Sequence, residues 1–198
     1  MKWILAALVV VMGLTLPQTA PAQAAHPDSV RGGNCRLASQ VLTTGQPAAR
    51  RQWALSYISY CPAATTAPAL RAGLTRAAAA GEVSTFQRLA STALYVHDDR
   101  LLDQLLSVAT NATYPERIRL AAMVKLDQLR APARVWKVEE LMQGDGRDCP
   151  NAVRSHPADV ASFPSRSRAF LARLETARAS LAADPAQPAS IRRLAKCM

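Results

Sequence analysis

Residues 114–129, YPERIRLAAMVKLDQL, decide the fold of this chain. Proline followed by glutamate is typical of a helix start, because proline needs no amide partner in the first turn and the carboxylate faces the positive end of the helix dipole. The apolar residues of this helix lie on two faces, with Ile118, Ala122, Leu126 and Leu129 on one and Leu120 and Val124 on the other. A helix that is apolar on both sides packs between neighbours, so the stretch predicts stacked helices.

The same spacing recurs along the chain. Four segments align without gaps on one pattern: 50–58, 86–94, 118–126 and 191–195. The pattern begins with an apolar position and a second position that is often Arg. Two variable residues, an alanine, three variable residues and a final apolar residue follow. Their second positions are residues 51, 87, 119 and 192, which gives steps of 36, 32 and 73 residues. The first segment departs from the pattern with Arg50 in the first apolar position. Alanine one turn into a helix lets a neighbouring helix approach closely, so the period predicts a repeat architecture.

A resemblance to a known family follows from these segments. Residues 114–122, continuing to Leu126 and Leu129, resemble the second helix of a HEAT repeat, and Asp184-Pro185 through Ala195 begins in the same way. The resemblance covers about 47–130 and part of the C-terminal region. It implies a HEAT-like (armadillo-type) all-α fold, in which antiparallel helix pairs stack into a short right-handed α-solenoid that often binds other proteins.

Glycine, proline and asparagine divide the chain into further elements. Helices are predicted at about 34–43, 48–60, 66–80, 84–96, 98–111, 115–130, 132–143, 163–183 and 188–197. Within 132–143, residues 134–138 alternate like a strand, but the Glu-Glu-Leu-Met that follows favours helix. Residues 144–162 are rich in Gly, Pro, Asp and Asn. We therefore expect one helical-repeat domain over 34–198, with an irregular insertion at about 144–162.

The first residues indicate export. Met1-Lys2 is a short positive start, residues 3–16 are almost continuously apolar, and Ala22-Gln23-Ala24 offers small residues at a signal-peptidase site. The apolar run is shorter than the about 20 residues that span a bilayer, although a retained membrane anchor is the alternative. We predict a signal peptide at 1–24 and a flexible segment at 25–33. The expected destination is a bacterial periplasm or the exterior, with no transmembrane segment after cleavage.

Four cysteines follow the predicted cleavage point: Cys35, Cys61, Cys149 and Cys197. An even number in an exported chain predicts disulfides, with three pairings open. We favour Cys35–Cys61 with Cys149–Cys197, because each bond then closes one end of the chain. Loop-closure entropy gives each bond about 3.5–4 kcal/mol at most. A metal site is the alternative, but no two cysteines lie within five residues of each other and no HxxxH accompanies them.

The chain is strongly basic. It carries 24 Lys and Arg against 14 Asp and Glu, a net charge of +10 at pH 7, of which residues 25–198 keep +9 because Lys2 falls before them. The excess favours anionic partners such as cell-envelope polymers or lipids, with plain solubility the equal alternative. Nucleic acid is not expected, because the arginines of 163–183 scatter around the helix axis and share no face with stacking aromatics.

Residues that carry chemistry are few. His156 lies in the 144–162 loop with Asp145, Asp148 and Asp159, but the alternating acidic positions and final Glu of a calcium loop are missing. No G-x-S-x-G, H-E-x-x-H or phosphate-binding glycine loop occurs. In His97-Asp98-Asp99, an aspartate is expected to cap a helix. The sequence therefore predicts no catalytic residue, no metal ligand and no cofactor.

The leading hypothesis is a non-enzymatic, exported protein-binding or scaffold module that uses stacked helical repeats. Its partner would be another exported or envelope protein, and Trp53 and Trp136 would mark the partner surface if their rings are exposed and not part of the core. The alternative is a basic binder of anionic envelope polymers or lipids. A third hypothesis is a hydrolase-type enzyme with its site in the 144–162 loop, at His156 and Asp148.

Overall fold

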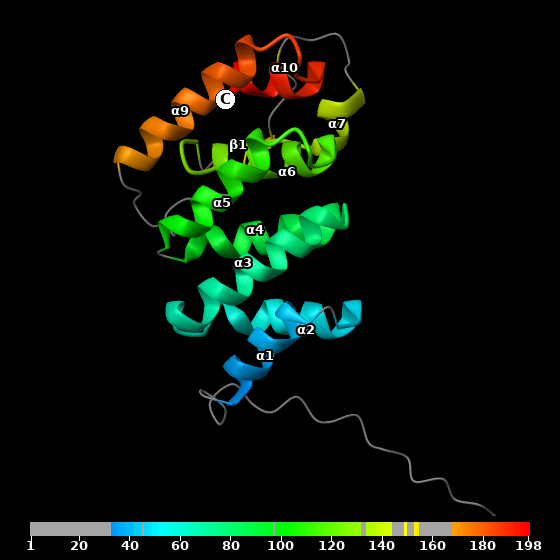
Figure 1. The fold of residues 1–198 in the computed structure, drawn as a ribbon, viewed down its shortest axis with the longest axis vertical. Helices are drawn as coiled ribbons and strands as arrows, with labels where there is room; N and C mark the ends of the chain where they lie inside the picture. The colour runs from blue at the N-terminus through cyan, green and yellow to red at the C-terminus, as the bar shows by residue number, and fades with distance from the viewer. Residues whose placement is uncertain are drawn as a thin grey trace, which may run out of the picture. The chain divides into compact units, whose positions relative to one another are not determined.

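The computed structural model describes residues 33–44, 46–96, 98–131, 134–143, 149, 153–154 and 168–198. The predicted signal peptide, His97 and most of the 144–162 loop, including His156 and Asp148, lie outside the described residues. Within these ranges the chain is helical, as predicted (Figure 1). The helices are α1 (Gly33–Thr43), α2 (Ala48–Ile58), α3 (Ala63–Ala79), α4 (Val83–Tyr95), α5 (Asp99–Thr110), α6 (Glu116–Asp127), α7 (Val138–Gln143), α9 (Arg168–Ala183) and α10 (Ala189–Cys197).

Proline sets the start of four of these helices. The residues before α2, α3, α6 and α10 are Pro47, Pro62, Pro115 and Pro188, with φ between −56° and −51°. The ring already holds φ close to the helical value, and its clash with the preceding residue keeps that residue out of the helical region. One residue type therefore separates a helix from the chain before it and orients its first turn.

Glycine sets the end of α3. Gly81 has φ +68°, its amide donates to the carbonyl of Ala78 at 3.2 Å, and the amide of Glu82 donates to the carbonyl of Ala77 at 2.9 Å. This pair of bonds is the Schellman motif, in which any side chain at the left-handed position costs about 1–2 kcal/mol. The turn makes Glu82 the N-cap residue of α4.

Helices that follow one another in the chain pack as pairs. α1 packs on α2, α3 on α4, α5 on α6, and α9 on α10 (Figure 1). The first helices of successive pairs also meet, as α1 with α3, α3 with α5, and α5 with α9. So do the second helices, as α2 with α4, α4 with α6, and α6 with α10. First helices that contact first helices, and second helices that contact second helices, form the two layers that stacked pairs require. The solenoid form and its right-handedness stay predictions.

The four segments aligned in the sequence all lie in second helices. Their aligned alanines are completely buried, each 0% exposed: Ala54, Ala90, Ala122 and Ala195. The apolar residues four positions later are buried as well: Ile58, Leu94 and Leu126. Arg50, the exception to the pattern, is exposed. The recurring spacing thus corresponds to a recurring buried position, although membership of the HEAT class stays a prediction.

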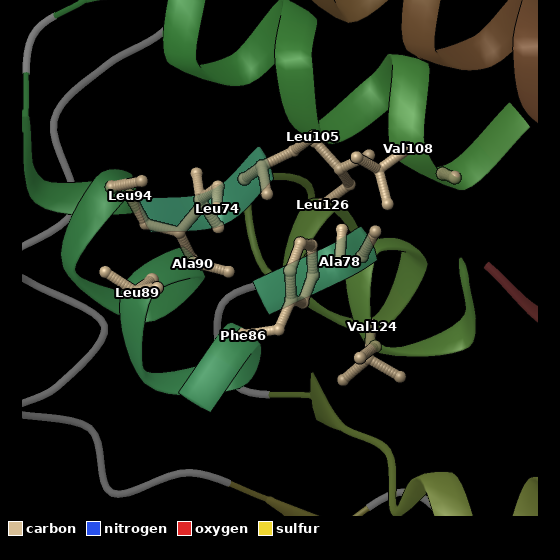
Figure 2. Close-up of a cluster of buried hydrophobic side chains, with 14 of the residues drawn as sticks. Leu74, Ala78, Phe86, Leu89, Ala90, Leu94, Leu105, Val108, Val124 and Leu126 are labelled. Carbon is tan, nitrogen blue, oxygen red and sulfur yellow. The ribbon is translucent and has the colours of Figure 1, made fainter. Parts of the chain in front are cut away.

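The core is continuous through α3, α4, α5 and α6. Figure 2 shows side chains from all four helices meeting, with the Phe86 ring of α4 close to Ala78 of α3 and Val124 of α6. Every residue of α6 from Ile118 to Val124 is buried, because α4, α5, α7 and α10 all pack on this helix. This agrees with the two apolar faces of residues 114–129.

The prediction of a single helix over 132–143 is wrong in its first half. Arg134–Val135 forms strand β1, which pairs antiparallel with β2 (Val153–Arg154), and Arg134 lies opposite Arg154. The helix begins only at Val138. Side-chain bonds from Arg134 and Trp136 to Asp127 hold the segment extended, a tertiary constraint that overrides its helix-favouring neighbours.

Both predicted disulfides are confirmed. Cys35 bonds to Cys61 and Cys149 bonds to Cys197, each with 5.6 Å between the Cα atoms. The first bond joins α1 to the turn after α2, and the second joins Cys149 to the end of α10. Among the described residues, no helix is both long and apolar enough to span a membrane.

Replacing Ala90 with leucine is expected to lower the free energy of unfolding by about 1–3 kcal/mol, because the buried face of α4 has no room for a larger side chain. The matched control is Ala172→Leu on α9, where the side chain is exposed and the expected change is within about 0.5 kcal/mol. Urea unfolding of the two oxidised proteins measures the difference. Equal midpoints would contradict the close packing of second helices at the aligned alanines.

Candidate functional site

A groove opens at the surface between α2 and α4, which touch each other only lightly. Its volume is about 150 Å³. Six residues line it and define what we call the α2–α4 groove: Arg51, Gln52 and Leu55 from α2, and Ser84, Thr85 and Arg88 from α4. Two arginines from different helix pairs therefore line one groove.

Polar residues keep this junction open. In the register of the aligned segments, Gln52 of α2 and Arg88 of α4 are equivalent to Leu120 of α6. Leu120 is fully buried, whereas Gln52 and Arg88 are exposed. An amide or guanidinium group loses its hydration if a neighbouring helix closes over it, and no apolar gain compensates for that loss. α4 and α6 therefore pack closely, whereas α2 and α4 touch only lightly.

Arg51 links α2 to the start of α4. Its Nη1 lies 3.3 Å from both carboxylate oxygens of Glu82, and both side chains are partly exposed. The Gly81 turn puts Glu82 in this position. An exposed pair of this kind contributes at most about 1 kcal/mol. The Arg51 guanidinium is therefore open to competition from another anion.

Arg88 has no such partner. Among the described residues, no carboxylate lies within ion-pairing distance of its guanidinium. Beside it, Ser84 and Thr85 add two hydroxyl groups that can donate or accept hydrogen bonds. Guanidinium groups bind carboxylates and phosphates through paired N–H donors, so the chemistry available to the groove is anion recognition.

Arg119 shows the same link in a closed junction. It occupies the position of Arg51 two repeats further along the second helices, and it is only 2% exposed. Its Nε donates to the carbonyl of Ala109 at 3.1 Å, and its Nη2 donates to Gln187, just before α10. Burial lowers the pKa of Arg119, and the nearby Glu116 charge opposes that shift. With its donors engaged inside the protein, Arg119 is a structural arginine.

A second polar cluster surrounds Asp127, which is fully buried. Its carboxylate accepts from Nε and Nη2 of Arg134 at 2.7 and 2.5 Å, and from Nε1 of Trp136 at 2.7 Å. Arg134 donates further to the carbonyls of Cys197 and Met198 at 3.2 and 2.8 Å. These bonds satisfy the carboxylate and tie β1 to the end of α10, so the cluster holds the fold together.

The two tryptophans proposed as a partner surface lie in different environments. Trp136 is 6% exposed and bonded to Asp127, so its ring belongs to the core. Trp53 is half-buried and stacks on Tyr57, with 4.9 Å between ring centroids. Tyr60, one turn further, is 88% exposed. The partner-surface prediction therefore remains only for Trp53 and its helix.

The other titratable residues with distinctive surroundings lie outside the groove. Burial lowers the pKa of Lys125, which is half-buried on α6. Asp98 caps α5 by accepting from the amide of Arg100 at 2.9 Å, which confirms an aspartate cap at this helix start. In the part of the chain that the structure describes, no three His, Cys, Asp or Glu side chains are grouped as they would be around a metal ion.

Sequence reasoning did not find the α2–α4 groove. Arg51 stands in the repeat pattern, but the pattern does not show which junction closes. The sequence offered one indication, the polar run Arg50-Arg51-Gln52 in α2. The residue of α6 equivalent to Gln52 is the apolar Leu120. Reading the aligned segments for differences would have pointed to α2.

Comparison with known proteins adds no family to this picture. The chain matches no protein-family model, no curated protein and no solved structure. The arrangement of the groove therefore carries the functional argument.

Asp127→Asn is expected to lower the free energy of unfolding by about 3 kcal/mol, because Arg134 loses its charged partner in a largely buried site. Glu139→Gln removes the same charge from an exposed position of α7 and serves as the control. Urea unfolding monitored by circular dichroism compares the two variants. If Asp127→Asn matched the control, the cluster would not hold the strand and α10 together.

Proposed function

We propose that this chain is a non-enzymatic, exported protein-binding module, and that the α2–α4 groove is part of its binding surface. The groove itself carries the proposal, because Arg88 has no carboxylate partner among the described residues and lies where α2 and α4 touch only lightly. At about 150 Å³ it is smaller than the roughly 300–1,000 Å³ of small-molecule and cofactor sites. It suits a single side chain of a larger partner.

Export rests on the predicted signal peptide, and the two disulfides are consistent with it. Disulfides persist in oxidising compartments, so a bacterial periplasm or the exterior is the place to look for the partner. The proposal includes HEAT-like stacking of the helix pairs, because stacked pairs present one extended surface with many side chains in fixed positions.

A second area on α2 supports an interaction role. Trp53, Tyr57 and Tyr60 follow one another at helical spacing, and Tyr60 is almost fully exposed. At about 100° per residue, Trp53 and Tyr57 lie on a different face of α2 from Arg51 and Leu55, and Tyr60 follows in the turn after the helix ends at Ile58. Large aromatic side chains are frequent anchors of protein interfaces. α2 therefore offers a charged face and an aromatic face.

Binding of anionic envelope polymers or lipids is the second candidate, favoured by the net charge of +9 that residues 25–198 keep and by Arg88, which has no carboxylate partner among the described residues. It differs from the first in its salt dependence. Attraction between exposed charges is largely screened beyond about 8 Å at physiological ionic strength, so polymer binding should collapse as salt rises. It should also depend on total charge and not on one arginine.

The test captures partners from envelope extract of the host on the immobilised, oxidised chain. Three forms are compared: wild type, Arg88→Glu and Arg117→Glu. Arg117 is an exposed arginine of α6 outside the groove, so both variants change the net charge equally. We expect a discrete protein to stay bound to wild type and Arg117→Glu through a high-salt wash, and to be lost from Arg88→Glu.

Two results would contradict the proposal. Retention of the same protein by all three forms would remove the groove from the binding surface. Capture of polyanionic material alone, released by high salt and weakened equally by both substitutions, would replace the module with the polymer binder.

A further inference from the structure

The α2–α4 groove also indicates what kind of group it receives. Arg51 and Arg88 come from different helices and both line this groove, so an anion bound in it lies beside two arginine side chains. Such an anion accepts charge-assisted hydrogen bonds from the arginines, which have no comparable acceptor within their own helices. Resting on the proposed function, we propose that the groove is a carboxylate-recognition site, which takes a glutamate or aspartate side chain of an extended acidic segment in the partner.

The charge of the site favours a carboxylate over a phosphate. Two guanidinium groups and the Glu82 carboxylate that pairs with Arg51 give a local charge of +1. One carboxylate neutralises this charge. A phosphate group carries about −1.5 to −2 at pH 7 and would leave excess negative charge beside Glu82.

Glu82 competes with any such ligand through its contact with Arg51, although it does not line the groove itself. Its contact with Arg51, at 3.3 Å to each oxygen, is longer than the about 2.7–2.9 Å of a strong charge-assisted hydrogen bond. An incoming carboxylate that also reaches Arg88 forms contacts that Glu82 lacks. The partner's acid therefore displaces a weak pair and gains a second guanidinium.

The remaining walls fit a peptide side chain. Leu55 provides an apolar surface for a methylene stem, while the hydroxyls of Ser84 and Thr85 can donate to carboxylate oxygens or to a peptide carbonyl. A bare inorganic ion makes no use of the apolar wall. The combination favours a glutamate or aspartate within a chain.

The experiment titrates the oxidised chain with a six-residue peptide of alternating Glu and Gly, blocked at both ends, and follows the arginine N–H signals by NMR. A peptide with Gln in place of Glu and inorganic phosphate are the comparison probes. We expect Arg88→Gln to raise the Kd of the Glu peptide about tenfold, the loss of charged hydrogen bonds. Arg117→Gln, the control of equal charge, should change it by less than about twofold.

Glu82→Gln provides a variant that acts in the opposite direction. Removing the competitor should lower the Kd of the Glu peptide about threefold, the value of an exposed ion pair. A variant that merely fails to fold cannot bind more tightly, so this gain separates recognition from stability. The same substitution should also improve phosphate binding, because it removes the charge that disfavours phosphate.

Several outcomes would overturn the assignment. Equal weakening by Arg88→Gln and Arg117→Gln would reduce the groove to bulk charge. Phosphate binding more tightly than the Glu peptide in wild type, or the Gln peptide binding equally well, would reject carboxylate recognition. If a captured protein depends on Arg88 while the Glu peptide does not bind, the binding module stands and only its ligand class is wrong. If the Glu peptide binds but no protein is captured, the proposed function fails and the carboxylate site remains.

Discussion

Close packing of the second helices at fully buried alanines is the constraint on which the rest of this structure depends. Ala54, Ala90, Ala122 and Ala195 each leave room for a neighbouring helix at the same point of the repeat. α6 then becomes buried on nearly every side, and its residues must be apolar or have all their polar groups bonded within the protein. Arg119 and Asp127 meet this requirement: Arg119 binds Ala109 and the distant Gln187, and Asp127 binds Arg134 and Trp136 of the segment that follows α6. The groove is the place where the constraint is relaxed.

One arginine position illustrates how the surroundings decide a role. In α6, Arg119 is enclosed by α5 and the turn before α10, and it acts as a rigid link between helix pairs. In α2, Arg51 makes a comparable contact with Glu82, the residue before α4, but its side chain stays 20% exposed. The arginine is structural in the buried junction, and in the partly exposed junction it is available to a ligand. In such a chain, candidate binding residues are therefore those that depart from the repeat pattern, because residues that keep the pattern are engaged in packing.

The sequence predicted most of the fold through local chemistry. Prolines at 47, 62, 115 and 188 and the glycine at 81 mark helix boundaries by their own backbone preferences, and the cysteines paired as their places in the chain suggested. The strand at Arg134–Val135 could not be predicted in this way, because its cause is Asp127 in another element. The groove escaped for a similar reason: whether a junction closes depends on both helices at once. The signal peptide and the 144–162 loop lie outside the described residues, so the predictions made for them stay predictions.

The two disulfides have a consequence for how the chain comes apart. In stacked pairs each unit is held by its neighbours, so a pair with a neighbour on one side only opens most easily. Among the described elements, α1 with α2 and α9 with α10 are such pairs. The first disulfide joins α1 to the turn after α2, and the second joins the end of α10 to Cys149. The cross-links sit where fraying would begin. In the oxidised chain, a covalent bond therefore restrains fraying at each outer pair of the described helices.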